Sequence, residues 1–168
     1  MNIFYLDSLP SVAAKSHCDQ HVSKMCIEYA QLMSTAHHLC DTDLDRSEIY
    51  KPTHVNHPSA IWVRSNRLHY DWTFRLWFSL LSEFRWRRGK SHGSQRLLRL
   101  LHTPPRLAVS EFIEPPQCMP DEFKQPCTIA AYRAYYHSKT FASWRWRREA
   151  PHWFSGSTSP ALHSESHV

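Results

Sequence analysis

Apolar residues recur at every third or fourth position through much of this chain, and this spacing constrains the fold more than any other feature. Because one face of an α-helix repeats about every 3.6 residues, the spacing predicts amphipathic helices rather than strands. The scarcity of glycine, three residues out of 168, agrees with a mainly helical chain. The clearest stretch begins at about Asp19 and has apolar residues at Val22, Met25, Cys26, Tyr29, Leu32, Met33 and Ala36.

Proline, glycine and polar residues divide the rest of the chain into further elements. Residues 58–88 predict one long helix or two abutting helices, with Pro58 at the first position, Ser65 and Asn66 as an internal cap and Gly89 as the C-cap. The other predicted elements are a short strand or extended lead-in over residues 2–6, a short turn over 12–17 capped by Ser11, an acidic loop over 41–48, helices over 94–102 and 128–137, and an irregular proline-rich loop over 103–127.

The length of the chain suits one ordinary domain. We expect a mainly α, single-domain helical bundle over residues 1–154, with a proline-rich irregular loop and a disordered C-terminal tail over residues 155–168. No apolar run approaches the ~20 residues of a membrane helix. The first residues predict no secretory signal, so the mature chain is expected to begin near Met1 and to lie in the cytoplasm. The five cysteines form no CxxC pair and predict reduced, largely buried thiols.

An excess of 20 Lys and Arg over 15 Asp and Glu favours a polyanionic partner, either nucleic acid or a nucleotide. Residues 85–90 and 144–148 interleave arginines with tryptophans, so that guanidinium groups can neutralise phosphates while rings stack on bases. The alternative is that the tryptophans belong to the core and the arginines are solvated. The residues assigned here to DNA binding are Trp86, Arg88, Lys90, Arg133, Trp144, Arg145 and Arg147.

Polar residues follow one side of the helix predicted from Asp19 onward. His21, Lys24 and Glu28 occupy positions i, i+3 and i+7, which fall within about 60° of one another around a helix. Asp19 lies near the helix start, where its carboxylate can cap backbone amides. These four residues are the candidate catalytic group. The alternative is a solvated face with an ordinary ion pair between Lys24 and Glu28.

A proline-stiffened loop over residues 51–58 ends where a helix is predicted to begin. Its polar side chains lie beside free backbone amides, an arrangement suited to a phosphate or a carboxylate. Two histidines separated by two residues are also a weak metal-site pattern, and the simplest alternative is that Asn56 and His57 only cap the helix. The substrate-binding residues assigned to this region are Lys51, His54, Asn56, His57 and Arg64.

Several of these segments carry a resemblance to known proteins. The run Cys18–His21, the later Glu28, the run Asn56–Pro58 opening a long helix and the aromatic C-terminal region are similar to the all-helical pyrimidine-dimer DNA glycosylases, the endonuclease V type of phage repair enzyme. The chain also resembles a set of phage-encoded proteins without a settled activity, over nearly all of residues 2–154. The segments that carry this second resemblance are Lys51–Pro58, Arg88–His92 and Pro116–Glu122.

The first resemblance implies a Schiff-base chemistry with a glutamate nearby, in which the nucleophile is the α-amino group of a small residue exposed by methionine removal. This chain departs from that pattern, because Asn2 is too large for efficient removal of Met1. The glutamate has a counterpart in Glu28. The amine would then come from Lys24, or a water activated by Glu28 or His21 would attack the sugar carbon directly.

The sequence therefore predicts a DNA base glycosylase-like enzyme that excises an extruded pyrimidine from double-stranded DNA without a metal or cofactor. Convergence of the candidate groups on one cleft rimmed by Arg88 and Arg133 would favour an enzyme, and their scatter would favour a DNA-binding protein. Three alternatives stay open: a base-modifying or transferase enzyme, a non-enzymatic DNA-binding protein, and a metal-dependent nucleotide phosphohydrolase. The last would use residues such as His37, His38, Asp41, Asp43 and Asp45.

Overall fold

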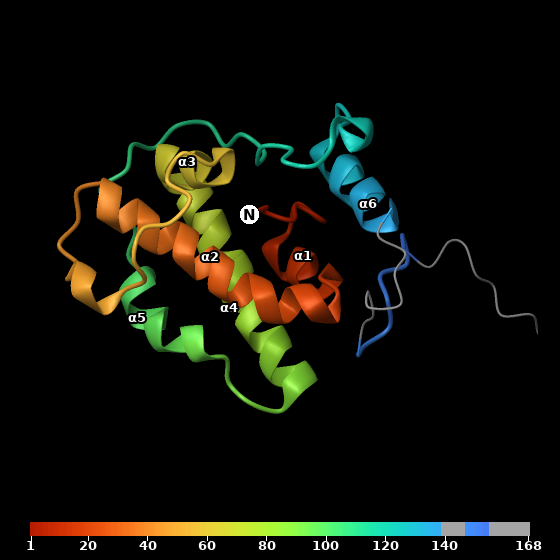
Figure 1. The fold of residues 1–168 in the computed structure, drawn as a ribbon, viewed down its shortest axis with the longest axis horizontal. Coiled ribbons are helices and arrows are strands. Elements are labelled where there is room, and N and C mark those ends of the chain that lie inside the picture. The colour runs from red at the N-terminus through yellow and green to blue at the C-terminus, as the bar shows by residue number, and fades with distance from the viewer. Residues whose placement is uncertain (139–146, 155–168) are drawn as a thin grey trace, which may run out of the picture.

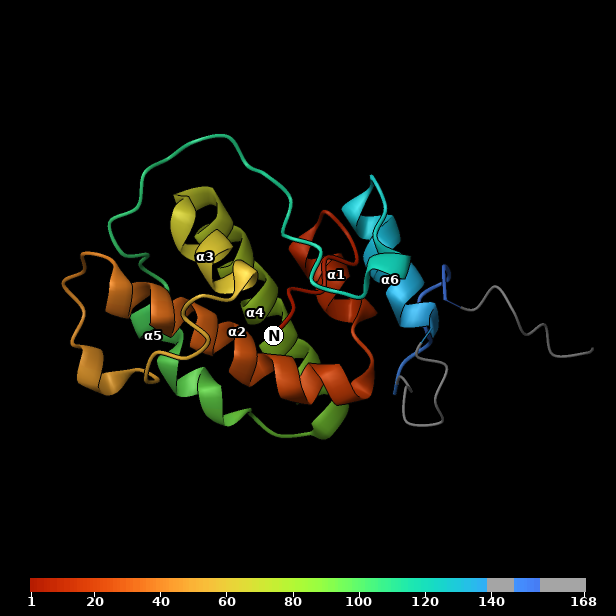
Figure 2. The same cartoon turned by 45° about the horizontal axis from the view of Figure 1, so that its top comes forward.

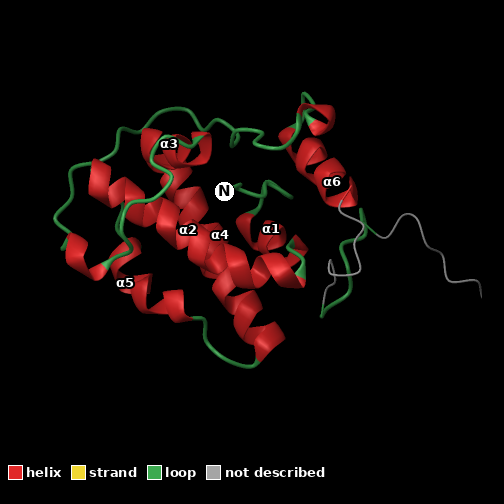
Figure 3. Cartoon of the chain, viewed as in Figure 1, coloured by secondary structure: helices red, strands yellow, loops and turns green. Residues whose placement is uncertain are grey.

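The computed structural model describes residues 1–138 and 147–154, and over these residues the chain is helical without any strand (Figures 1 and 3). The predicted mainly α class is therefore confirmed, while the predicted tail over 155–168 lies outside the described residues. Among the described helices, none is long and apolar enough to cross a bilayer. The longer α-helices are α1 (Pro10–Ser16), α2 (Asp19–Leu39), α3 (Pro58–Ser65), α4 (Arg67–Arg88) and α6 (Thr128–Ser138), with the four-residue α5 (Leu98–Leu101) and the 3-10 turns η1 (Arg46–Glu48), η2 (Gly93–Leu97) and η3 (Asp121–Phe123).

The first residues run as an extended segment through the middle of the molecule, where Figure 1 marks the N-terminus. Residues 3–6 are buried but form no ladder, so the extended lead-in is confirmed and the strand is not. Their backbone is held by side chains instead: the amide of Phe4 donates to the Tyr29 hydroxyl at 3.2 Å, and the Arg133 guanidinium donates to the carbonyl of Leu6 at 3.0 Å. These bonds satisfy polar groups that a buried extended segment would otherwise leave unpaired.

The starts of the first two helices differ from the prediction. Helix α1 has Pro10 in its first turn and Leu9 at its N-cap, so Ser11 is not the cap. Helix α2 has the length and start that the apolar spacing predicts, but its N-cap is Cys18, and no side chain caps it. Asp19 is therefore not a capping residue, because its carboxylate is bonded elsewhere.

Residues 58–88 form two helices that meet at Asn66, which is one of the two predicted alternatives. The Asn66 side chain accepts from the amide of Leu68 at 3.0 Å and donates to the carbonyls of Ser110 and Glu111. One side chain thus caps α4 and attaches the long loop to the helix junction. At the other end, Gly89 adopts a left-handed conformation with φ 69°, as predicted for a C-cap.

The segment between α4 and α6 contains less helix than predicted. The single helix expected over 94–102 is η2 followed by the single turn α5. Residues 103–127 form the expected irregular loop apart from η3, and the loop passes around α3 before it reaches α6 (Figure 2). Hydrogen bonds from the amide of Arg67 to Ala108 and from the indole of Trp62 to the carbonyl of Ile113 hold it in place.

The five cysteines are all free thiols, as predicted, but fewer of them are buried than the sequence predicts. Cys18 and Cys26 are buried, Cys40 and Cys118 are half-buried, and Cys127 is exposed. Burial raises the pKa of the Cys26 thiol to about 12, which leaves it protonated and unreactive.

Candidate functional site

The central pair of the predicted polar stripe is Lys24 and Glu28. The ammonium nitrogen of Lys24 lies 3.3 Å from a carboxylate oxygen of Glu28, one helical turn further along α2. The two side chains differ in environment, because Lys24 is 62% exposed and Glu28 is 17% exposed. The carboxylate is therefore the more desolvated group and the ammonium the more mobile one.

The turn that precedes α3 presents two histidines, and Glu28 is near enough to one of them, His57, to raise its pKa. The amide of His57 donates to the carbonyl of His54 at 2.9 Å, which closes a tight turn. His54 has a φ of 47°, a left-handed conformation that is strained for a residue with a Cβ. His57 is the N-cap of α3, and its Nδ1 accepts from the amide of Ser59 at 3.1 Å. Neutral His57 consequently carries its proton on Nε2, which remains a donor.

Electrostatic effects on His57 show which charges lie near it. Its pKa is lowered by burial first and then by the amino group of Met1 and by His54, while Glu28 raises it. These effects place His57 within electrostatic range of Glu28 and of the amino group of Met1. The side-chain oxygen of the adjacent Asn2 is buried without a hydrogen-bond partner among the described residues, and such an acceptor is suited to a ligand or water donor.

Two contacts hold the histidine turn in place. The Thr35 hydroxyl exchanges hydrogen bonds with the backbone of Thr53, at 3.2 and 3.3 Å, and so attaches the loop to α2. Arg64 donates to the carbonyl of Val55 at 2.8 Å from the last turn of α3. Arg64 is half-buried and helps to position the turn, and its predicted substrate-binding role stays a prediction. The predicted Lys51 and Asn56 are both exposed on this loop.

Lys24 also lines an open cavity of about 650 Å³ between α2 and the end of α4. The predicted residues Arg88 and Lys90 line it together with Lys24. Sequence reasoning did not assign the other lining side chains, three polar and two apolar, to a site, because such residues are common on any helix surface. They are Gln20, Ser23, Ile27, Phe84 and His92.

His21 belongs to the interior rather than to the site. Its ring lies 4.2 Å from the ring of Phe4, and its Nδ1 lies 2.7 Å from the Tyr136 hydroxyl. Burial, with smaller effects of His17 and Lys24, lowers the pKa of His21 to about 3, so the imidazole stays neutral at pH 7. A base this weak does not activate water efficiently near neutral pH. Helical spacing located His21 on the stripe, but only the packing of α6 and the first residues reveals its burial.

Asp19 forms part of a buried ion cluster around Arg87, which we call the Arg87 cluster. The fully buried guanidinium of Arg87 donates to Asp19 at 3.2 Å, to Glu83 at 3.0 Å and to the carbonyls of Lys15 and His17. Arg148 adds two hydrogen bonds to Glu83, at 2.8 and 3.0 Å. Every partner is a protein group, so this part of the basic segment over 85–90 joins elements together instead of facing a ligand.

Of the C-terminal residues predicted to bind DNA, two form hydrogen bonds within the protein and two lie outside the described residues. Arg147 donates through its guanidinium to the carbonyl of Arg87 and through its amide to Asp19. Arg133 binds the carbonyl of Leu6 and Asp7, so it does not rim the same site as Arg88. Trp144 and Arg145 lie outside the described residues. Of the predicted groups, Lys24, Arg88 and Lys90 line one cavity, whereas Arg133 lines another and His21 is buried.

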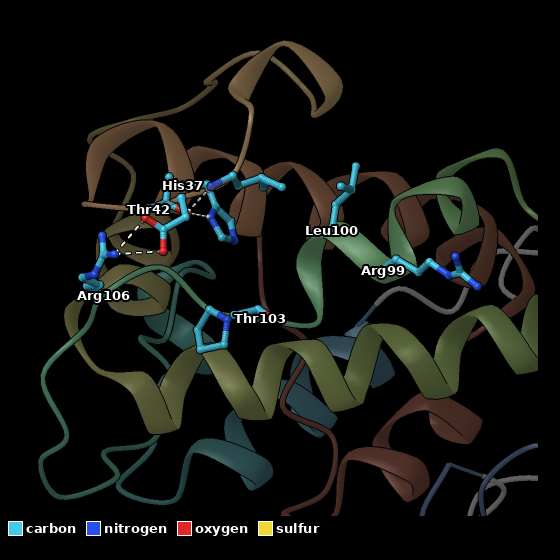
Figure 4. A pocket seen from close by; sticks show the side chains of 9 residues that line it. His37, Thr42, Arg99, Leu100, Thr103 and Arg106 are labelled. Carbon is cyan, nitrogen blue, oxygen red and sulfur yellow. Dashed lines mark hydrogen bonds and ion pairs between the residues drawn. The ribbon is translucent and has the colours of Figure 1, made fainter.

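The residues proposed for a metal centre are engaged with protein partners. His37 lines a separate cavity of about 290 Å³, where its ring bonds to the Thr42 hydroxyl and Arg106 binds Asp43 through two contacts of 2.8 Å (Figure 4). The other ring nitrogen of His37 lies 3.0 Å from the Tyr70 hydroxyl. Burial first lowers the pKa of His37 to about 4. Within residues 1–138 and 147–154, no three His, Cys, Asp or Glu side chains are grouped so that they could hold a metal ion.

Comparisons of the chain with protein-family models, curated proteins and solved structures return no match.

Proposed function

We propose that this protein is a DNA-acting enzyme that excises a pyrimidine base from an extruded nucleotide. The observation that carries the proposal is the position of Glu28, a largely desolvated carboxylate beside Lys24 and in electrostatic contact with the His57 turn. Glycosidic bond cleavage needs a carboxylate that stabilises positive charge on the sugar or activates a water, next to groups that hold phosphate. This combination favours excision among the enzymatic alternatives.

In the proposed reaction, water attacks the C1′ carbon of the sugar as the N-glycosidic bond breaks, and the base leaves with the bonding electrons and takes up a proton. Glu28 stabilises the developing positive charge or removes a proton from the water. Lys24 is largely exposed and paired, the environment of an ordinary solvated ammonium, so we assign it to charge balance rather than to a Schiff base. The Nε2 donor of His57 and the exposed His54 would hold a phosphate or a base edge.

The test is incubation of the protein with duplexes that each carry one damaged or modified pyrimidine, including a cyclobutane dimer. Release of free base and the resulting abasic site are measured by mass spectrometry. We expect release by the wild type and a loss of roughly 100-fold or more in Glu28→Gln, the range found when a general base is removed. Glu122→Gln, an exposed carboxylate in η3, is the matched control and should retain full activity.

A borohydride trapping experiment separates the two chemistries. Reduction should give no covalent protein–DNA product if water is the nucleophile, whereas a product that disappears in Lys24→Gln would reassign the attack to Lys24. Wild-type protein that releases no base from any of these duplexes, or a fully active Glu28→Gln variant, overturns the proposed function.

The second candidate is a DNA-binding protein without catalysis. It is favoured by one observation: Lys24 and Glu28 form the i,i+4 ion pair typical of a solvated helix face, while the weak base His21 is buried below it. This candidate predicts salt-sensitive DNA binding that is unchanged by Glu28→Gln.

A further inference from the structure

The cavity between α2 and the end of α4, which we call the α2/α4 cavity, has a composition that identifies its ligand. Lys24, Arg88 and Lys90 line it, and none of its lining residues is acidic. Lys24 pairs with Glu28 at 3.3 Å outside this lining, whereas Arg88 and Lys90 form no ion pair among the described residues. Two cations that share a space without a carboxylate repel one another, and an anion between them relieves that repulsion.

The cavity walls are held in place independently of any ligand. His92 caps η2 by accepting from the amide of Ser94 at 3.1 Å, and its ring meets the ring of Phe84 edge-on at 4.8 Å. Burial lowers the pKa of His92 and the backbone of Ser23 raises it, so the imidazole lies near α2 as well as against Phe84 of α4. Lys90 therefore stands on a short segment fixed at one end by the Gly89 cap and at the other by His92.

The same cavity also has apolar and neutral polar surface. Ile27 is 41% exposed and forms apolar lining with Phe84, while Gln20 and Ser23 add hydrogen-bonding groups from the first turns of α2. At about 650 Å³, the cavity falls in the size range of small-ligand sites, roughly 300–1,000 Å³. A phosphate beside a sugar or base matches this mixture of cations, amide, hydroxyl and apolar surface.

We infer that the α2/α4 cavity binds a phosphate ester of a nucleotide, and that it does so through Lys90, Arg88 and Lys24. This inference rests on the proposed function for its biological setting, since Lys24 also contacts Glu28 and would link the phosphate site to the carboxylate. Lys24 has the exposure and side-chain length to exchange the carboxylate for the phosphate. The bound phosphate belongs either to a DNA strand or to a free nucleotide.

The test measures binding of a fluorescently labelled oligothymidylate by anisotropy and of dTMP by NMR titration, both at low salt. Loss of one charge-assisted phosphate contact is expected to weaken binding by roughly tenfold. We expect this loss in Lys90→Gln and in Arg88→Gln. Lys90 is exposed and forms no side-chain hydrogen bond or ion pair with the described residues. Lys90→Gln therefore keeps the test valid if Arg88→Gln, which loses a bond to the carbonyl of Asp19, folds poorly.

Arg99→Gln is the matched control, because Arg99 is an exposed cation that lines two other cavities. Weaker binding of the oligonucleotide alone identifies a strand phosphate, and weaker binding of both probes identifies a site that also accepts a free nucleotide. Unchanged affinity for both probes in Lys90→Gln, or an equal loss in Arg99→Gln, overturns the inference. Base excision by a protein whose affinity is unchanged in Lys90→Gln would overturn the cavity site and leave the proposed function standing.

Discussion

Two ion pairs with the same helical spacing have opposite environments in this protein. Lys24 and Glu28 on α2 lie 3.3 Å apart with side chains 62% and 17% exposed, whereas Arg87 and Glu83 on α4 lie 3.0 Å apart with side chains 0% and 7% exposed. The buried guanidinium of Arg87 donates to carboxylates and carbonyls of the protein. The exposed ammonium of Lys24 pairs with one carboxylate and is otherwise accessible to solvent. A structural charge is distinguished from a candidate functional one by its burial and by how many of its hydrogen-bond donors are already bonded, and not by its residue type.

The largest expected effect comes from Arg87→Met. This substitution removes the Arg87 partner of the buried Glu83 carboxylate and of the half-buried Asp19 carboxylate, and breaking a buried pair in this way typically costs about 3–5 kcal/mol. Urea unfolding followed by circular dichroism measures the change. Arg106→Met, which removes two exposed ion pairs, should leave the midpoint nearly unchanged. Equal midpoints for both variants would show that the Arg87 cluster does not hold the elements together.

The second largest effect is expected from acidification, which should destabilise the fold through the buried histidines His17 and His21. Burial is the main cause that lowers the pKa of His17 to about 4 and of His21 to about 3, so both are neutral in the folded protein. Unfolded histidine has a pKa of about 6.5, so the unfolded state binds more protons below that pH. Stability is therefore complete above about pH 6.5 and falls toward pH 4, by up to about 1.4 kcal/mol per pH unit for each histidine.

Urea midpoints measured between pH 7.5 and pH 4.5 test this dependence. His21→Gln should reduce the slope, because it removes one of the titrating groups. A slope that is the same in His21→Gln and in the wild type would contradict the assignment of His21 as a buried neutral side chain.

A smaller effect is expected at the strained turn of the candidate site. His54→Gly relieves the left-handed backbone at φ 47°, and we expect it to be more stable than His54→Ala by about 1 kcal/mol. Both variants lose the contact between the His54 ring and the Thr53 hydroxyl, so their difference isolates the backbone effect. Thermal unfolding of the two variants provides the measurement. A glycine variant that is less stable than the alanine variant would show that the turn is not strained.

The smallest effect on folding is expected at the candidate catalytic pair. Lys24→Gln and Glu28→Gln each remove one i,i+4 ion pair, which contributes about 0.3–0.5 kcal/mol. Their urea midpoints should stay close to the wild-type value even though Glu28→Gln loses base excision. A large loss of stability in either variant would show that the Lys24 and Glu28 pair is a structural ion pair like those of the Arg87 cluster.

Local signals in the chain were sufficient for most helices. The apolar spacing predicted α2, Pro58 and Gly89 predicted where α3 begins and α4 ends, and Asn66 predicted the break between them. These features act over one or two turns, so the sequence alone is enough to identify them. Part of the candidate site was equally local: the contact between Lys24 and Glu28 follows from helical geometry, and His57 follows as the residue before Pro58.

The sequence by itself determined the helical class, the Lys24 and Glu28 pair and the histidine turn at the start of α3. Only the tertiary structure decided that His21 and Arg87 are buried and that Arg88 and Lys90 share a cavity with Lys24. The physical reason is that burial depends on partners far away in the chain. Tyr136 covers His21 from 115 residues away, and the carbonyl of His17 meets Arg87 across 70 residues. Helical periodicity specifies a face of each helix, and packing decides which faces meet.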